Sequence, residues 1–171
     1  MLTKNFYSYI MAAFQKTSAT FTLPDGTTNM TNLSSDTPPF NAMNAWADRT
    51  TNIKGVSFGT GTTPATASDY SLESMLDSTQ ISVATPSSVS FSKVDTYEEY
   101  SVTFGVTNKT AKAITISEVG LTAIPYSYTS STNIFKYALV DRTVLDTPVT
   151  IPAGQSKQIT YTIRFNYGDA V

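Results

Sequence analysis

The sequence predicts an all-β protein: an antiparallel β-sandwich with a short N-terminal helix. The chain carries 29 Thr and 20 Ser in 171 residues, and β-branched Thr suits the half-buried surface of a strand. Apolar and polar residues alternate with a period of two over much of the second half. Pro, Gly and Asn interrupt the alternating segments at short intervals, as turns between strands do.

The first 18 residues are expected to form the helix. Leu2, Phe6, Ile10 and Phe14 recur at four-residue steps, which is the spacing of one face of an amphipathic helix. This face either lies on the protein's own domain or docks onto a neighbouring subunit. Because the rest of the composition is typical of a β protein, we favour a docking element.

Residues 19–85 are expected to form an extended arm, loops and the first strands. A short strand near residues 20–23 leads into a turn at Pro24-Asp25-Gly26. Two successive prolines before Phe40 exclude a helix and an interior strand, so this part is expected to run extended over a surface. Trp46, the only Trp, is interpreted as a core or interface anchor rather than a ligand platform.

A further strand is predicted at residues 53–60, followed by a tight loop and a short helical stretch at residues 68–76. The loop contains Gly59-Thr-Gly61 but lacks the third glycine of a dinucleotide fingerprint and the Gly-Lys-Ser/Thr of a phosphate loop. Asp69, Glu73 and Asp77 follow at four-residue steps, and we interpret them as a solvated helical face. No calcium-loop pattern accompanies them.

Residues 86–171 are expected to form the core of the sandwich, within a single domain overall. The count of about six strands favours an immunoglobulin-like arrangement. A jelly roll is the alternative, because alternation does not determine connectivity. The predicted strands cover residues 87–93, 100–107, 113–123, 134–142, 148–151 and 157–166.

The composition excludes several functions and partners. Without Cys or His, the chain cannot form a disulfide, use a thiol nucleophile, or build the usual zinc site or Ser-His-Asp triad. The net charge is −2 and the 11 basic residues are scattered, which argues against a nucleic-acid partner. No cofactor is expected. A hydrolase using only carboxylates remains compatible with the composition, although no carboxylate pair is indicated.

Membrane insertion and secretion are not expected either. No segment approaches the roughly 18 apolar residues of a membrane span. The uninterrupted apolar run near the N-terminus is shorter than the roughly 7–15 residues of a secretory core. We therefore expect a protein made in the cytoplasm and not secreted.

Aromatic residues gather around the polar stretch 127–133. Tyr126, Tyr128, Phe135 and Tyr137 flank it in the sequence. Such a loop could stack on a sugar ring or form part of a subunit interface, where aromatic residues are enriched. We favour the interface.

Two segments resemble sequences of small structural proteins of tailed bacteriophages. In residues 54–73 a strand ends in Gly-Thr-Gly-Thr-Thr-Pro and leads to Asp-Tyr-Ser-Leu-Glu. In residues 138–165 an Arg-Thr strand is followed by Pro-Val-Thr-Ile, a Gly turn and Thr-Tyr-Thr-Ile. Together they cover a little over a quarter of the chain, and neither is a catalytic motif.

The resemblance implies a non-enzymatic virion protein, repeated in many copies around a tail, neck or capsid, with other virion proteins and its own copies as partners. A carbohydrate-binding module that attaches to a host surface is the alternative; it depends on Trp46 and the aromatic residues near 126–137 being exposed together. The candidate subunit-interface residues are Leu2, Phe6, Ile10, Phe14, Phe40, Trp46, Tyr126 and Tyr128.

Overall fold

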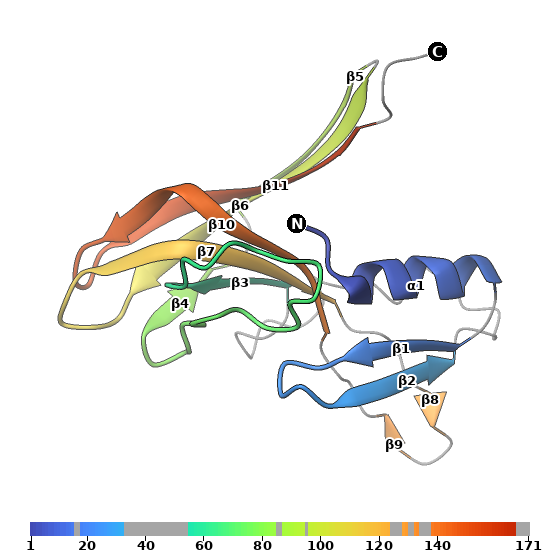
Figure 1. Ribbon diagram of the computed structural model, residues 1–171. Helices are drawn as coiled ribbons and strands as arrows, with labels where there is room; N and C mark the ends of the chain where they lie inside the picture. The colour runs from blue at the N-terminus through green and yellow to red at the C-terminus, as the bar shows by residue number, and fades with distance from the viewer. Residues whose placement is uncertain are drawn as a thin grey trace. The chain divides into compact units, whose positions relative to one another are not determined.

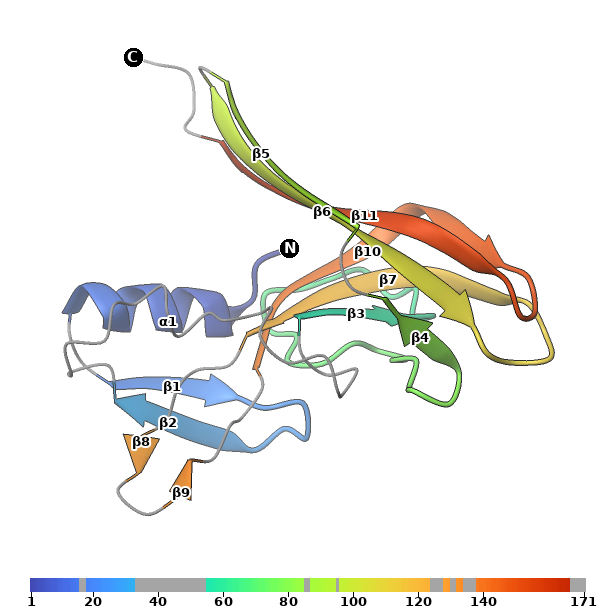
Figure 2. The same ribbon diagram turned by 180° about the vertical axis from the view of Figure 1, so that it is seen from behind.

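The computed structural model describes residues 1–15, 18–32, 55–84, 87–94, 96–123, 128–129, 132–133 and 138–166. In these ranges the chain forms one helix and eleven strands (Figures 1 and 2). The elements are α1 (Lys4–Gln15), β1 (Ser18–Thr22), β2 (Thr28–Asn32), β3 (Gly55–Gly59), β4 (Ile81–Val83), β5 (Ser88–Val94), β6 (Tyr97–Asn108), β7 (Ile114–Ala123), β8 (Tyr128–Thr129), β9 (Thr132–Asn133), β10 (Ala138–Ile151) and β11 (Ser156–Asn166).

The predicted all-β class is confirmed. Antiparallel sheets dominate the described residues, the two larger sheets match those expected of a sandwich, and the short N-terminal helix is present. The choice between an immunoglobulin-like arrangement and a jelly roll stays a prediction. Helix α1 is too short to cross a membrane, and the described residues contain no other helix.

The chain divides into two compact units, each built from two separate segments. Unit 1 comprises Met1–Leu76 and Thr115–Val149, and unit 2 comprises Asp77–Ile114 and Thr150–Val171. The boundaries predicted at residues 18 and 85 stay predictions. Each unit is described by itself below.

Unit 1 contains a three-stranded sheet in the order β10-β7-β3. Strand β3 runs antiparallel to β7, from Gly55 opposite Thr122 to Gly59 opposite Glu118. All five residues of β3 are buried, so no alternation of exposure remains along it. Apolar side chains fill this core, including Val56, Phe58, Leu72, Leu76, Ile116, Val119, Leu121 and Leu139.

The N-terminal helix of unit 1 lies beside the hairpin β1–β2 (Figure 1). The predicted turn at Pro24-Asp25-Gly26 is confirmed: Gly26 has a φ of 81°, and Asp25 Oδ1 accepts a hydrogen bond from the Thr27 amide at 2.9 Å. Asn5, which is 5% exposed, joins the helix to β1. Its amide donates to the Thr22 carbonyl at 2.8 Å and accepts from the Thr22 N–H at 2.8 Å.

The helical stretch predicted at residues 68–76 is wrong, because the structure has turns and bends there. The physical reason lies in the carboxylates of this segment. Asp69 accepts a hydrogen bond from the Thr66 N–H at 2.9 Å, and Glu73 accepts one from the Thr63 N–H at 2.9 Å. Side chains that bond to nearby backbone amides compete with helical hydrogen bonding.

Unit 2 contains a sheet in the order β11-β6-β4, with β5 also paired to β6. Strand β6 is long enough for two partners on one side: β4 pairs with residues 106–108 and β5 with residues 97–103. Strand β11 runs antiparallel to β6 along residues 97–107. The core of the unit consists of Ile81, Val102, Phe104, Val106, Ile114, Ile151, Ile159 and Tyr161.

Candidate subunit interface

The predicted docking face of α1 is half-buried in its described part. Leu2, Phe6 and Ile10 have intermediate exposure. Leu2 precedes the helix and pairs with Asp141 of β10 in an isolated antiparallel bridge. Among the helix side chains that the structure describes, the exposed apolar ones are instead Tyr7 and Met11, at 54% and 55% exposure. Each lies one position along the chain from a predicted residue, Phe6 or Ile10.

The other predicted interface residues cannot be placed in the same way. Phe40, Trp46 and Tyr126 lie outside the described residues. Phe14 lies in α1 and Tyr128 in β8, but their side chains are outside the described part. The aromatic sugar-binding hypothesis depends on these residues, and it stays a prediction.

A second surface lies in unit 2, where β5, β6 and β11 run side by side (Figures 1 and 2). We call the part formed by β5, residues 97–103 of β6 and residues 160–166 of β11 the ribbon. Directly paired residues of neighbouring strands share one face of a sheet. The register places Phe91, Tyr100 and Ile163 in one row, and Lys93, Glu98 and Phe165 in a row on the same face.

This apolar face of the ribbon continues past the end of the covered core. Val102 is completely buried and Tyr161 is 7% exposed, but Tyr100 and Ile163, one row further along, are only half-buried. Phe91 is 66% exposed and Phe165 is 44% exposed. These are the two exposed large apolar side chains on the described part of unit 2. The sequence alternation predicts one continuous face, whereas burial ends halfway along it.

The opposite face of the ribbon is lined by hydroxyl groups. Ser101 and Thr162 are hydrogen-bonded across the strands at 2.7 Å, and Thr103 and Thr160 at 2.8 Å. Exposed Ser88, Ser90 and Ser92 belong to the same face on β5. These pairs give one role for the abundant Ser and Thr: small hydroxyls can satisfy one another across a wet sheet surface without carrying charge.

The charges of the ribbon are paired within it. Lys93 lies 3.2 Å from Glu98, and Arg164 lies 2.7 Å from Glu99. The Arg164 guanidinium also lies 4.2 Å from the centre of the Tyr97 ring. The hydrogen bond to Glu99 is the main cause that raises the pKa of Arg164. The ribbon thus presents a face on which exposed aromatic side chains lie beside the Lys93–Glu98 ion pair, and the charges of the ribbon are paired with one another.

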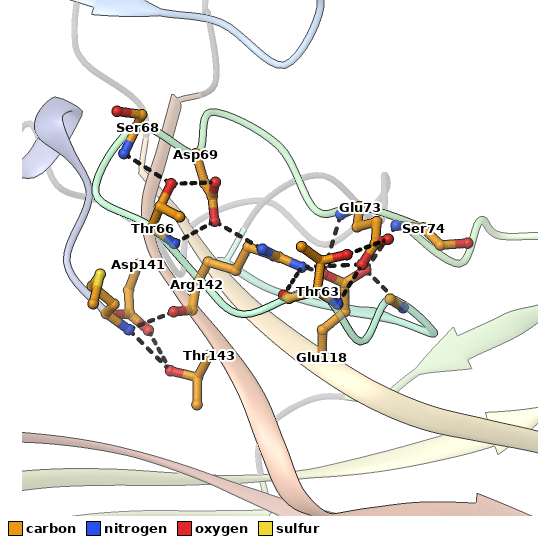
Figure 3. A network of polar contacts seen from close by, with 12 residues as sticks. Thr63, Thr66, Ser68, Asp69, Glu73, Ser74, Glu118, Asp141, Arg142 and Thr143 are labelled. Carbon is orange, nitrogen blue, oxygen red and sulfur yellow. Dashed lines mark hydrogen bonds and ion pairs between the residues drawn. The ribbon is translucent and has the colours of Figure 1, made fainter.

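Sequence reasoning missed a charged cluster in unit 1, centred on Arg142 of β10 (Figure 3). Arg142 is 3% exposed and Glu118 of β7 is completely buried. The Arg142 Nε donates to Glu118 at 2.8 Å and Nη1 donates to Asp69 at 2.8 Å, while Nη2 lies 3.5 Å from Glu73. Asp69 and Glu73 therefore pair with Arg142. The predicted helical face is absent, but Glu73 and Asp77 are exposed as predicted, whereas Asp69 is half-buried.

Four donors surround the carboxylate of Glu118. Its Oε1 accepts hydrogen bonds from the Gly61 and Ser74 N–H groups at 3.1 and 2.7 Å. Its Oε2 accepts from the Glu73 N–H at 3.1 Å and from Arg142. With both oxygens occupied, Glu118 is placed to fix the loop of residues 60–76 against β7.

The glycines of the sequence motif fit around this buried carboxylate. A Cβ atom added to Gly61 would lie 2.6 Å from Glu118 Oε1 and 2.6 Å from the Glu73 Cβ. The Gly-Thr-Gly segment is therefore explained by close packing and not by phosphate binding. Two features of the sequence could have indicated this site: two glycines next to the end of a strand, and a single Glu, Glu118, within an apolar strand.

The outer carboxylates of the cluster have pKa values below their ordinary range. Burial acts to raise the pKa of Asp69, but hydrogen bonds from the Thr66 backbone and Arg142 outweigh it. Hydrogen bonds from the Thr63 backbone and hydroxyl lower the pKa of Glu73. Both groups are ionised at neutral pH and stabilise the arginine. Among the described residues, no group of three acidic side chains is arranged to hold a metal ion.

A scan against protein-family models found no match to this chain, and neither did searches of curated proteins and of solved structures.

Proposed function

We propose that the protein is a non-enzymatic structural subunit of a tailed-bacteriophage virion, assembled in multiple copies in the tail, the neck or the capsid surface. One observation carries the proposal: the apolar face of the ribbon continues beyond the core that covers it. Phe91 and Phe165 leave apolar surface in water that a neighbouring subunit would cover. Exposed apolar surface of this kind marks sites of protein association.

The exposed area is large enough to matter. A Phe side chain buries about 150–250 Å² when fully covered. At 66% exposure, Phe91 alone leaves roughly 100–165 Å² in water. At about 25 cal/mol per Å², covering that surface would contribute about 2–4 kcal/mol before the costs of association are subtracted.

The low charge of the chain supports the same proposal. Only 14% of its residues are charged, against about 25% in an average soluble domain. Burying unpaired charges between closely packed subunits is costly, whereas paired hydroxyls are not. The hydroxyl face of the ribbon and its internally paired charges suit a subunit surrounded by other subunits.

The experiment combines two measurements on the intact protein. Native mass spectrometry of the purified chain over a concentration series tests self-association, and quantitative mass spectrometry of purified phage particles tests incorporation. We expect oligomers at high concentration and many copies per particle. A chain that stays monomeric at every concentration and is missing from the particles would refute the proposal.

A further inference from the structure

Strand β5 forms one edge of the ribbon. In the described residues it pairs with β6 only, along all seven of its residues. An edge strand exposes a row of backbone donors and acceptors that another strand can pair with. Natural proteins often protect such edges with a lysine. The single lysine of β5, Lys93, stands next to the end of the strand and lies 3.2 Å from Glu98, so residues 88–92 carry no charge.

We propose that the partner of this edge is β5 of a second copy of the chain, related by a two-fold axis at Phe91. This inference rests on the proposed function and names the contact between subunits. The two copies would run antiparallel and join their ribbons into one continuous sheet. Phe91 is the middle residue of Ser88–Val94, so an axis there pairs all seven residues of each strand.

The side chains of β5 complement themselves in this register. Ser90 lies opposite Ser92 of the second copy, which repeats the hydroxyl pairing seen between Ser101 and Thr162 at 2.7 Å. The two Phe91 side chains meet on the apolar face and cover each other. Lys93 lies opposite Val89, so like charges do not face one another.

The charge pattern favours a second copy over a partner of different composition. Both ion pairs of the ribbon are satisfied within one chain, at 3.2 Å for Lys93–Glu98 and 2.7 Å for Glu99–Arg164. No uncompensated charge on the described ribbon selects a strongly acidic or basic partner. A seven-residue edge buries less than the roughly 1,200 Å² of a stable pair, so the contact depends on many copies acting together.

The chain contains no native Cys, which permits a direct test by disulfide cross-linking. The Ser90→Cys and Ser92→Cys proteins are prepared separately and then mixed at high concentration under mild oxidation. Opposed residues of an antiparallel pair come within reach of a disulfide, whereas diagonal neighbours about 7–8 Å apart do not. We expect a cross-linked dimer in the mixture and at least tenfold less in either protein alone.

Two lysine variants in the same cysteine backgrounds serve as a matched pair. Phe91→Lys places two positive charges at the axis and should abolish the cross-link. Gln158→Lys, on β11 at the other edge and outside the ribbon, should leave it intact. Phe91 and Gln158 are both exposed, so each variant should keep the circular dichroism spectrum of the parent.

The outcomes separate this inference from the proposed function. A chain that forms oligomers and enters particles without the mixed cross-link overturns the β5 contact and leaves the virion proposal in place. Equal cross-linking in the single-variant samples overturns the register. A monomeric chain that is missing from particles overturns both proposals.

Discussion

Replacing Glu118 with Gln tests the charged cluster of unit 1 most directly. The substitution keeps the size and shape of the side chain and removes its charge. Four donors point at the carboxylate: the N–H groups of Gly61, Glu73 and Ser74, and Nε of Arg142. An amide has only one acceptor oxygen, and its NH₂ group is itself a donor. In either orientation of the Gln side chain, two of the four donors lose their partner.

The expected cost follows from these counts. A buried donor left without an acceptor costs about 1–3 kcal/mol, so two cost about 2–6 kcal/mol. Removing one partner of a buried ion pair costs about 3–5 kcal/mol. Glu118 is completely buried, and solvent cannot replace the lost contacts without opening the loop. We therefore expect the Glu118→Gln variant to lose about 3–5 kcal/mol of unfolding free energy.

The assay is urea unfolding followed by circular dichroism, together with amide hydrogen exchange. Protection should fall at the Gly61, Glu73 and Ser74 amides. Glu99→Gln is the matched control, because Glu99 pairs with Arg164 in an exposed ion pair and such pairs contribute little to stability. A loss below about 1 kcal/mol in Glu118→Gln, or equal losses in the two variants, would refute this explanation of the loop.

Two further predictions concern the same loop. Asp69 and Glu73 have lowered pKa values, so their stabilising effect is fully present above their ordinary pKa values of 3.8 and 4.5 and is lost as the pH falls through the folded-state values. Urea midpoints measured from pH 7 to pH 2 should therefore drop in that acidic window. The drop should be smaller in an Asp69→Asn/Glu73→Gln double variant. Gly61→Ala should destabilise the protein by about 1–3 kcal/mol through overpacking. Gly105→Ala should be tolerated, because its new Cβ would meet only the Ala84 Cβ at 3.5 Å. Thermal unfolding compares the two variants, and equal melting temperatures would contradict the close packing of Gly61 against Glu118 and Glu73.

Strands with one exposed face could be predicted from the sequence because their pattern has a period of two. The segment at residues 157–166 corresponds closely to β11, Ser156–Asn166. The amphipathic helix was also recognised, since α1 covers Lys4–Gln15. The turn at Pro24-Asp25-Gly26 was readable because Gly26 supplies the positive φ that the turn requires.

The charged cluster could not be predicted because its members are far apart in the sequence. Arg142 and Glu118 come from β10 and β7, and Asp69 comes from a loop. The four-residue spacing between Asp69 and Glu73 is also the spacing of one face of a helix. The local pattern therefore predicts a helix where the structure has turns and bends. Only the pairing of distant strands brings these groups to one arginine.

In the ribbon, the apolar alternation of the sequence extends further than the buried core. Strand β11 keeps its apolar residues in phase from Ile159 to Phe165, a pattern that predicts burial of all four of them. In the structure, Ile159 and Tyr161 are buried, while Ile163 and Phe165 become progressively more exposed. We propose that a second chain covers the apolar residues beyond Tyr161, because the protein's own core extends only as far as Tyr161. On this proposal, two subunits meet along the part of the ribbon where the apolar alternation of the sequence continues beyond the buried core.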